Sequence, residues 1–173
     1  MKSSELQKED FNPYYAPYLA ALGDVKLVET LKKQLENFPS FISSIPEYKL
    51  NYSYGEGKWT IAQVLVHILD TERVFQYRAL RFARSDKTPL PGFDQDMFVS
   101  DSNAENWSRE EVIDNYRIIR KSTIALFEKF SEKDLKKVGV ASDSPMSVAA
   151  LGFICCGHQK HHRNILRERY LKD

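Results

Sequence analysis

The sequence has few residues that would cross-link the chain or anchor it in a membrane. Its only cysteines, Cys155 and Cys156, are adjacent, and neighbours on a helix point about 100° apart, which disfavours a bridge between them. No apolar run approaches the length needed to cross a bilayer. The polar first residues contain no apolar core of signal-peptide length. We therefore expect a cytoplasmic protein with no disulfide framework and no membrane partner.

The charge balance and the composition limit the classes of partner and fold. The net charge is only +1, so the broad positive footprint of a nucleic-acid-binding protein is missing, and we expect no nucleic-acid partner. Hydrophobic residues make up 42% of the 173 residues and charged residues 28%, which is ordinary for a globular protein. This length suffices for one full hydrophobic core. The sequence thus predicts one domain over residues 1–173.

Helical periodicity is present in four segments, and no convincing strand alternation competes with it. The segments comprise residues 24–37, 60–84, 108–130 and 147–170. Capping-box patterns begin the second segment at Thr60 and the third at Ser108, whereas Pro39 ends or kinks the first. Residues 139–143 form a break before the last segment. Four amphipathic helices of this length predict an all-α protein, with a four-helix bundle as its architecture.

A long connection separates the second and third predicted helices. It covers residues 85–106 and contains Pro89, Pro91 and Gly92. Loops of this length are usually functional or carry short structure of their own. A crossover of this kind also means that the bundle need not have a simple up-down-up-down order. The apolar part of the loop, residues 87–99, could form a lid or a dimer contact, or a rigid crossover packed on the bundle.

Three of the four histidines lie on the last predicted helix. His158 and His162 are spaced i and i+4, so they lie one turn apart on one face. The same face carries apolar residues, namely Leu151, Ile154 and Ile165. On the second predicted helix, the core-facing stripe is polar at its centre, and it consists there of Gln63, His67, Thr71 and Arg78. Because polar groups in a core are costly unless they are paired or liganded, we expect a cleft along this stripe.

The spacing of these residues fits a metal site at His67, His158 and His162. Neutral imidazole binds divalent transition metals well, and three protein ligands with open positions are typical of catalytic zinc sites. Helix geometry leaves alternatives open. The histidines could be hydrogen-bonded core residues, His161 would replace His162 if the helix were rotated, and Cys155 lies about one turn from His158.

Three charged residues near His67 are candidates for roles in chemistry. Arg78 and Arg81 could hold an anionic group of a substrate or cofactor, with Arg78 also a catalytic candidate. Their alternative is an ion pair with Glu72 or with an acidic loop residue. Asp70 could orient a ligating imidazole or act as a general base. Its alternative is an i to i+3 ion pair with Arg73.

Two stretches resemble the DinB-like family of bacterial proteins. They are residues 57–99, which contain KWTIAQVLVHILD, and residues 157–170, GHQKHHRNILRERY. The resemblance implies an up-down-down-up four-helix bundle with a metal, often nickel or zinc, held by His67, His158 and His162. It also implies a homodimer. Some relatives are thiol-dependent S-transferases or a mycothiol-dependent isomerase, and others are described only as metal-dependent hydrolases.

These observations favour a metal-dependent enzyme that acts on a small molecule. A divalent ion with open positions would activate a water or a low-molecular-weight thiol for attack on an electrophile. A thiol S-transferase-like reaction is the first expectation. A metal-dependent hydrolase and a non-catalytic metal or small-molecule binding module are the alternatives. No nucleophile elbow and no phosphate-binding glycine loop is visible in the sequence, which excludes several other enzyme classes but does not separate these possibilities.

Overall fold

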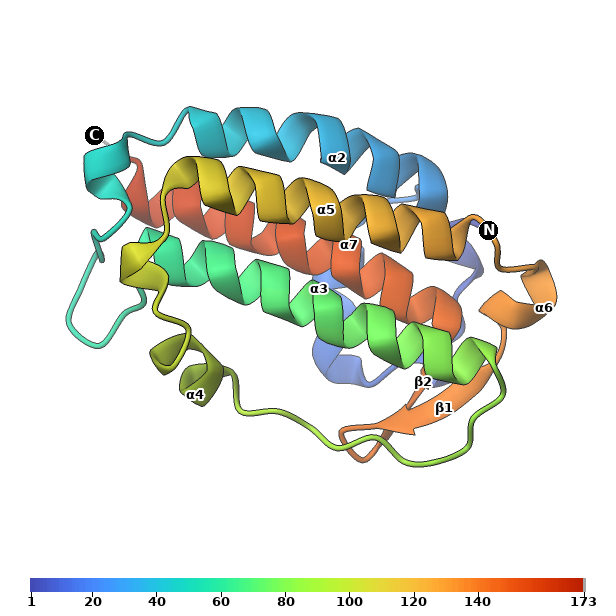
Figure 1. Cartoon of the computed structure of the whole chain (residues 1–173). Helices are drawn as coiled ribbons and strands as arrows, with labels where there is room; N and C mark the ends of the chain where they lie inside the picture. Colours follow the sequence, from blue (N-terminus) through green and yellow to red (C-terminus); the bar gives the residue numbers. More distant parts are fainter. Residues whose placement is uncertain (173) are drawn as a thin grey trace.

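Four long helices dominate the computed structural model, which describes residues 1–172 (Figure 1). They are α2 (Leu27–Ser43), α3 (Ile61–Ala83), α5 (Arg109–Phe127) and α7 (Val148–Ile165). A π-helical turn, Leu166–Tyr170, continues α7. The four lie side by side, which confirms the predicted all-α class and bundle architecture.

The helix ends show how the bundle is connected. Arg109 at the start of α5 donates to the carbonyl of Ile45, just after α2, at 2.9 Å. Tyr170 donates to the carbonyl of Trp59, just before α3, at 2.8 Å. The end of α2, the starts of α3 and α5, and the end of α7 therefore share one end of the bundle. In Figure 1, α2 and α7 accordingly run one way and α3 and α5 the other.

Local capping begins the helices where the sequence indicates. The Thr60 hydroxyl accepts from the Gln63 amide at 3.2 Å, and the Gln63 side chain accepts from the Thr60 amide at 2.8 Å. Ser108 and Glu111 form the same reciprocal pair at α5, so both predicted capping boxes are confirmed. The prediction that the first helix ends near residue 37 is wrong. Helix α2 continues past Pro39 to Ser43, because the residues beyond the proline bury apolar side chains in the core.

The connections carry structure of their own. The long crossover contains α4 (Gln95–Ser100) and a short 3₁₀ turn (Ala104–Asn106). It therefore carries short structure of its own, which is one of the two expectations for a loop of this length. The expected break at 139–143 lies within an antiparallel hairpin of β1 (Val138–Ala141) and β2 (Ser144–Ser147). Its turn has positive φ at Ser142 and Asp143, a pattern typical of two-residue hairpin turns. Strands of four residues are too short for their alternation to be recognised.

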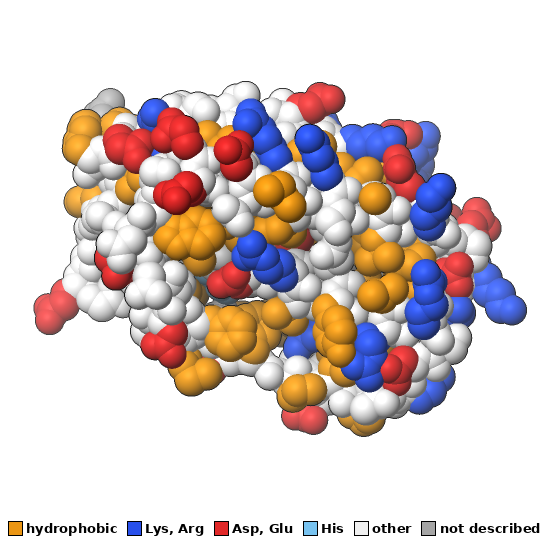
Figure 2. Space-filling view, in the orientation of Figure 1, with side chains coloured by type: hydrophobic (Ala, Val, Ile, Leu, Met, Phe, Trp, Pro, Cys, Tyr) orange, Lys and Arg blue, Asp and Glu red, His pale blue; other side chains and the backbone are white. Residues whose placement is uncertain are grey.

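The hairpin and the crossover pair with one another. The amide of Leu90 donates to the carbonyl of Val140 at 2.9 Å, and the amide of Ser142 donates to the carbonyl of Leu90 at 3.1 Å. This pairing holds the first part of the crossover across one face of α3. Figure 2 shows a hollow between α3 and the crossover, with hydrophobic side chains gathered around it.

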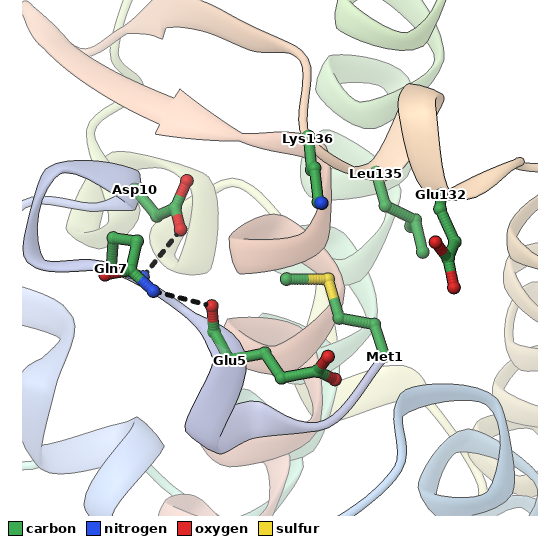
Figure 3. A pocket seen from close by; sticks show the side chains of 7 residues that line it. All are labelled: Met1, Glu5, Gln7, Asp10, Glu132, Leu135 and Lys136. Carbon is green, nitrogen blue, oxygen red and sulfur yellow. Dashed lines mark hydrogen bonds between the residues drawn. The ribbon is translucent and has the colours of Figure 1, made fainter.

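The N-terminal region, for which the sequence predicts no helix, packs against α7. It forms short 3₁₀ turns and α1 (Ala16–Leu22). Gly157 on α7 permits the close approach of α1, because a Cβ atom at this position would lie 2.3 Å from the carbonyl oxygen of Tyr18. Farther along, the N-terminus lies near α6 (Glu132–Leu135), and the two enclose a mixed polar and apolar pocket (Figure 3).

A buried polar network joins the four helices near the middle of the bundle. Arg120 on α5 makes two hydrogen bonds to the carboxylate of Glu72 on α3, at 2.7 and 2.8 Å. It also donates to Gln34 on α2 at 2.7 Å, and Gln34 donates to the backbone carbonyl of Cys156 on α7 at 2.9 Å. The network holds the helices in register because each buried polar group has a partner. Within residues 1–172, no helix combines the length and the apolar character that a membrane span requires.

Candidate metal centre

The three histidines His67, His158 and His162 meet between α3 and α7. The Nε2 atom of His158 lies 2.9 Å from Nε2 of His67 and 3.0 Å from Nε2 of His162. One ring nitrogen from each residue lies within 4.8 Å of the other two. His67 and His158 are 91 positions apart in the sequence. They meet because α3 and α7 pack against each other. The structure therefore brings together the residues that the sequence singled out.

Burial keeps these imidazoles neutral. Loss of hydration lowers the pKa of His67 to about 4, although the charge of Asp96 opposes this shift. Burial, together with the smaller effect of the neighbouring His67 and His161, lowers the pKa of His162 to about 3. The pKa of His158 falls well below its usual range, again mainly because of burial. Three neutral rings with converging nitrogens present lone pairs to one point, which is the state that metal binding requires.

Two of the three nitrogen–nitrogen spacings are close to those around a small divalent ion. In a tetrahedral zinc site with Zn–N bonds of about 2.0–2.1 Å, the ligand nitrogens lie about 3.3–3.4 Å apart. The two contacts of 2.9 and 3.0 Å require an outward movement of only a few tenths of an ångström. In a neutral imidazole, Nε2 of His158 carries either one proton or one lone pair. Hydrogen bonding alone can therefore satisfy only one of its two contacts.

Other side chains orient the three rings. Trp59 packs on His67 with ring centroids 4.8 Å apart, and the Thr71 hydroxyl lies 3.5 Å from Nδ1 of His67. The ring of Tyr18 meets His158 edge-on at 5.7 Å and His161 at 4.9 Å. His161 is thus directed towards α1, and its nitrogens do not join the cluster.

A cavity of about 340 Å³ opens beside the histidines. Its size falls within the range of small-molecule sites. The lining contains two of the histidines, His67 and His158, together with Thr71 and a set of aromatic side chains, Tyr14, Tyr15, Tyr18, Phe75 and Phe93. Arg78, Asp94, Gln95 and Ser142 complete it. The cavity therefore joins α1, α3, the crossover, the hairpin turn and α7 at one place.

The candidate charged residues lie in different surroundings. Arg78 lines the cavity. Arg81 forms an ion pair with Asp86 on the exposed side of the helix end, and Asp70 pairs with Arg73 at 2.9 Å. Neither Arg81 nor Asp70 lines the cavity, so the structure places both in the ion pairs that were their alternatives. We assign neither of them a role at the histidines.

Cys155, the remaining alternative ligand, is not part of the cluster. It is buried, and burial raises the pKa of its thiol well above the usual range. The group of side chains in residues 1–172 that converges with His158 contains no cysteine. A neutral thiol beside the Glu72–Arg120 pair behaves as a small apolar residue and not as a metal ligand.

Sequence reasoning missed the N-terminal wall of the cavity and the turn that closes it. Tyr14, Tyr15 and Tyr18 come from a segment with no clear helical pattern, and the signal available was only the clustering of three tyrosines within residues 13–18. Ser142 lies in the unrecognised hairpin. Within residues 1–172, the pocket in Figure 3 contains no histidine, and its N-terminal residues contact one another: the Gln7 amide donates to Asp10 at 2.7 Å.

Known proteins share this sequence pattern and fold. Residues 30–166 match the DinB superfamily. A protein of Oceanobacillus iheyensis named "Putative metal-dependent hydrolase" is 27% identical over 136 residues, which cover 75% of this chain and 78% of that protein. The structure of YfiT from Bacillus subtilis is described as "a probable metal-dependent hydrolase with an unusual four-helix bundle topology". It matches with a TM-score of 0.68 at 11% identity, over 92% of this chain and 87% of that one. Since the superfamily match spans most of the sequence, the chain belongs to the DinB superfamily.

Proposed function

We propose that His67, His158 and His162 hold one divalent metal ion, nickel or zinc, and that the protein is a metal-dependent hydrolase of a small molecule. The observation that carries the proposal is the convergence of three neutral imidazoles, two of them buried and the third half-buried, at the edge of a cavity. Three protein ligands leave coordination positions free. The relatives named as metal-dependent hydrolases support the choice of reaction.

The residues of the chain prepare the site in three ways. The helix contacts between α3 and α7 hold the imidazoles together before any ion arrives. Trp59 and Tyr18 fix ring orientations, and the aromatic walls of the cavity exclude bulk water from one side. When bound, the ion would supply a Lewis acid that activates water for attack on an ester, amide or related bond.

The expectation of a thiol S-transferase-like reaction receives no support from the relatives reported above, so we propose hydrolysis in its place. A low-molecular-weight thiol as cofactor remains a prediction to be tested in parallel. A cytoplasmic location, a homodimer, a single domain over 1–173 and the lack of a nucleic-acid partner also stay predictions from the sequence.

Metal analysis of purified protein tests the site. Wild-type protein loaded with zinc or nickel should contain one ion per chain, and the His67→Ala variant should lose it. His161→Ala is the matched control, because this histidine is on the same helix as two ligands but outside the cluster, and it should retain the ion. If wild type cannot be loaded, or if His161→Ala loses the ion while His67→Ala keeps it, the proposed site is wrong.

Activity measurements test the reaction. Loaded wild type should hydrolyse members of a panel of small esters, amides and phosphoesters, and removal of the metal by a chelator should abolish the rate. A parallel panel should combine thiols with electrophiles. Metal-dependent thiol transfer without hydrolysis would overturn the hydrolase assignment, and a loaded protein inactive in both panels would point to a binding module.

A further inference from the structure

Arg78 is a buried cation that lines the cavity beside the histidines. Only 2% of its surface is exposed, and it lies on the same stripe of α3 as His67, three turns farther along the helix. Its guanidinium packs over the rings of Phe75 at 5.8 Å and Phe93 at 5.9 Å. Cation–π contacts offset only part of the cost of burying a charge, on the order of 0.5–2 kcal/mol each.

Arg120 shows how this fold neutralises a buried arginine. It is fully buried, with 0% exposure, and Glu72 accepts two hydrogen bonds from it. Within residues 1–172, no carboxylate forms an ion pair with Arg78. Arg78 is thus buried like Arg120 but lacks the carboxylate partner that Arg120 has. Burying a charge without such a partner is costly.

The hydrogen bonds of Arg78 to the crossover and the hairpin turn use one nitrogen of its guanidinium. Nη2 donates to the carbonyl of Pro91 at 2.9 Å and to the Ser142 hydroxyl at 3.1 Å. These contacts fix the plane of the group against the crossover and the hairpin turn. Nε and Nη1 donate to no carbonyl or carboxylate in the described part of the chain, and the Tyr15 hydroxyl is within hydrogen-bonding reach of the guanidinium. Donors on these nitrogens, held in a fixed plane, can bind an oxygen of a carboxylate or phosphate.

The remaining charges around the cavity do not replace this anion. Asp94 lines the cavity, but one of its carboxylate oxygens caps α4 by accepting from the amides of Asp96 and Met97, at 2.9 and 3.0 Å. Asp96 is exposed, and its negative charge raises the pKa of His67, against the larger effect of burial. The histidines are neutral, so Arg78 is the one positive side chain that lines the cavity within residues 1–172.

We propose that the cavity binds a small molecule with an oxyanionic group, a carboxylate or a phosphate, held by Arg78, and with an apolar body held by the aromatic walls. Arg78 and His67 are eleven residues apart on α3, about 16 Å along the axis. The long arginine side chain leans back towards the helix start, so the ligand must span on the order of 10 Å to reach the histidines. That this ligand is the substrate rests on the proposed function, whereas the anion site itself requires no metal.

Binding of simple probes to metal-free protein tests the proposal. Chelator-treated protein should be titrated by calorimetry with benzoate, phenyl phosphate and neutral benzamide, which share an aromatic body. We expect benzoate or phenyl phosphate to bind wild type at least tenfold more tightly than benzamide, and the stronger of the two identifies the oxyanion. The Arg78→Met variant should lose this preference, and Arg78→Lys, which keeps the charge without the planar guanidinium held by Pro91 and Ser142, should show an intermediate one.

Two controls separate anion binding from damage to the fold. Arg81→Met removes a nearby arginine that is outside the cavity, so it should keep a preference of at least tenfold. Thermal unfolding of each variant shows that it is folded. Absence of a preference in wild type, or an unchanged preference in folded Arg78→Met or Arg78→Lys, would overturn the proposal. Because the titration uses metal-free protein, its failure is distinct from failure of the metal analysis.

Discussion

Replacing Gly157 by alanine should loosen α1 while the bundle remains folded. The new Cβ atom would lie 2.3 Å from the carbonyl oxygen of Tyr18, 2.7 Å from its carbonyl carbon and 3.0 Å from its Cβ. Cβ atoms essentially never approach closer than 3.0 Å. The backbone of α1 must therefore retreat by at least about 0.7 Å, and it cannot respond by a simple rotamer change.

The magnitude follows from two opposing terms. Overpacking of this kind costs about 1–3 kcal/mol, and alanine in place of glycine within a helix returns up to about 1 kcal/mol. Detachment of α1 is the competing response, because this short helix buries only one fully buried side chain, that of Leu22, worth about 1.5–3 kcal/mol. We expect the free energy of opening α1 to fall by about 1–2 kcal/mol, which is a factor of roughly 5–30 in the open population.

Hydrogen–deuterium exchange measures this opening directly. Peptides that cover residues 14–22 should exchange roughly 5–30 times faster in Gly157→Ala than in wild type, while peptides from α3 and α5 should change little. Gly55→Ala is the control, since its Cβ would meet only Cγ of Lys58 at 3.7 Å. Equal or slower exchange of residues 14–22 in Gly157→Ala would refute the view that this glycine sets the approach of α1 to the histidines.

Three further predictions concern stability. Glu72→Ala should lower the free energy of unfolding, measured with urea, by about 3–5 kcal/mol because Arg120 loses its counter-charge. The double variant with methionine at both positions should recover much of this loss. A cost of Glu72→Ala below about 1 kcal/mol would contradict the role of the pair. Metal-free wild type should lose stability as the pH falls from about 6.5 towards 4. The pKa of His67 is about 4 in the folded chain and about 6.5 when unfolded, so the unfolded chain binds the extra proton, and the contribution is on the order of 3 kcal/mol. His67→Asn should show a shallower loss over this range, and parallel curves would count against a buried neutral His67. Zinc at one hundred times its dissociation constant should stabilise wild type by about 2.7 kcal/mol, seen as a higher melting temperature, and should have no such effect on His67→Ala.

The helix starts could be predicted because capping is a local interaction. Thr60 and Ser108 each bond to a residue three positions away, so the pattern is complete within four letters of sequence. The end of α2 could not be predicted in this way. Whether a helix continues past Pro39 depends on what its next residues bury, and Phe41 and Ile42 are buried by other parts of the chain.

The candidate site divides along the same line. The i and i+4 spacing of His158 and His162 and the polar stripe around His67 are properties of single helices, so they could be recognised from the sequence. The choice between His161 and His162 depends on the rotation of α7 against α3, which is set by packing. Likewise, Arg78 and Arg81 both lie near the His67 stripe on a helical wheel, so the sequence does not distinguish their roles.

Only the tertiary structure separates those two arginines. Arg81 lies at the end of α3, where Asp86 is five residues away and can pair with it. Arg78 is covered by Pro91 and by Ser142, the latter 64 residues farther along the chain, and is left inside a cavity. The sequence by itself determined the four long helices, the capped starts of α3 and α5 and the three candidate histidines, since these depend on neighbours within one or two turns. The tyrosine wall, the isolated arginine and the meeting of the histidines depend on contacts between distant segments, which only the packed bundle provides.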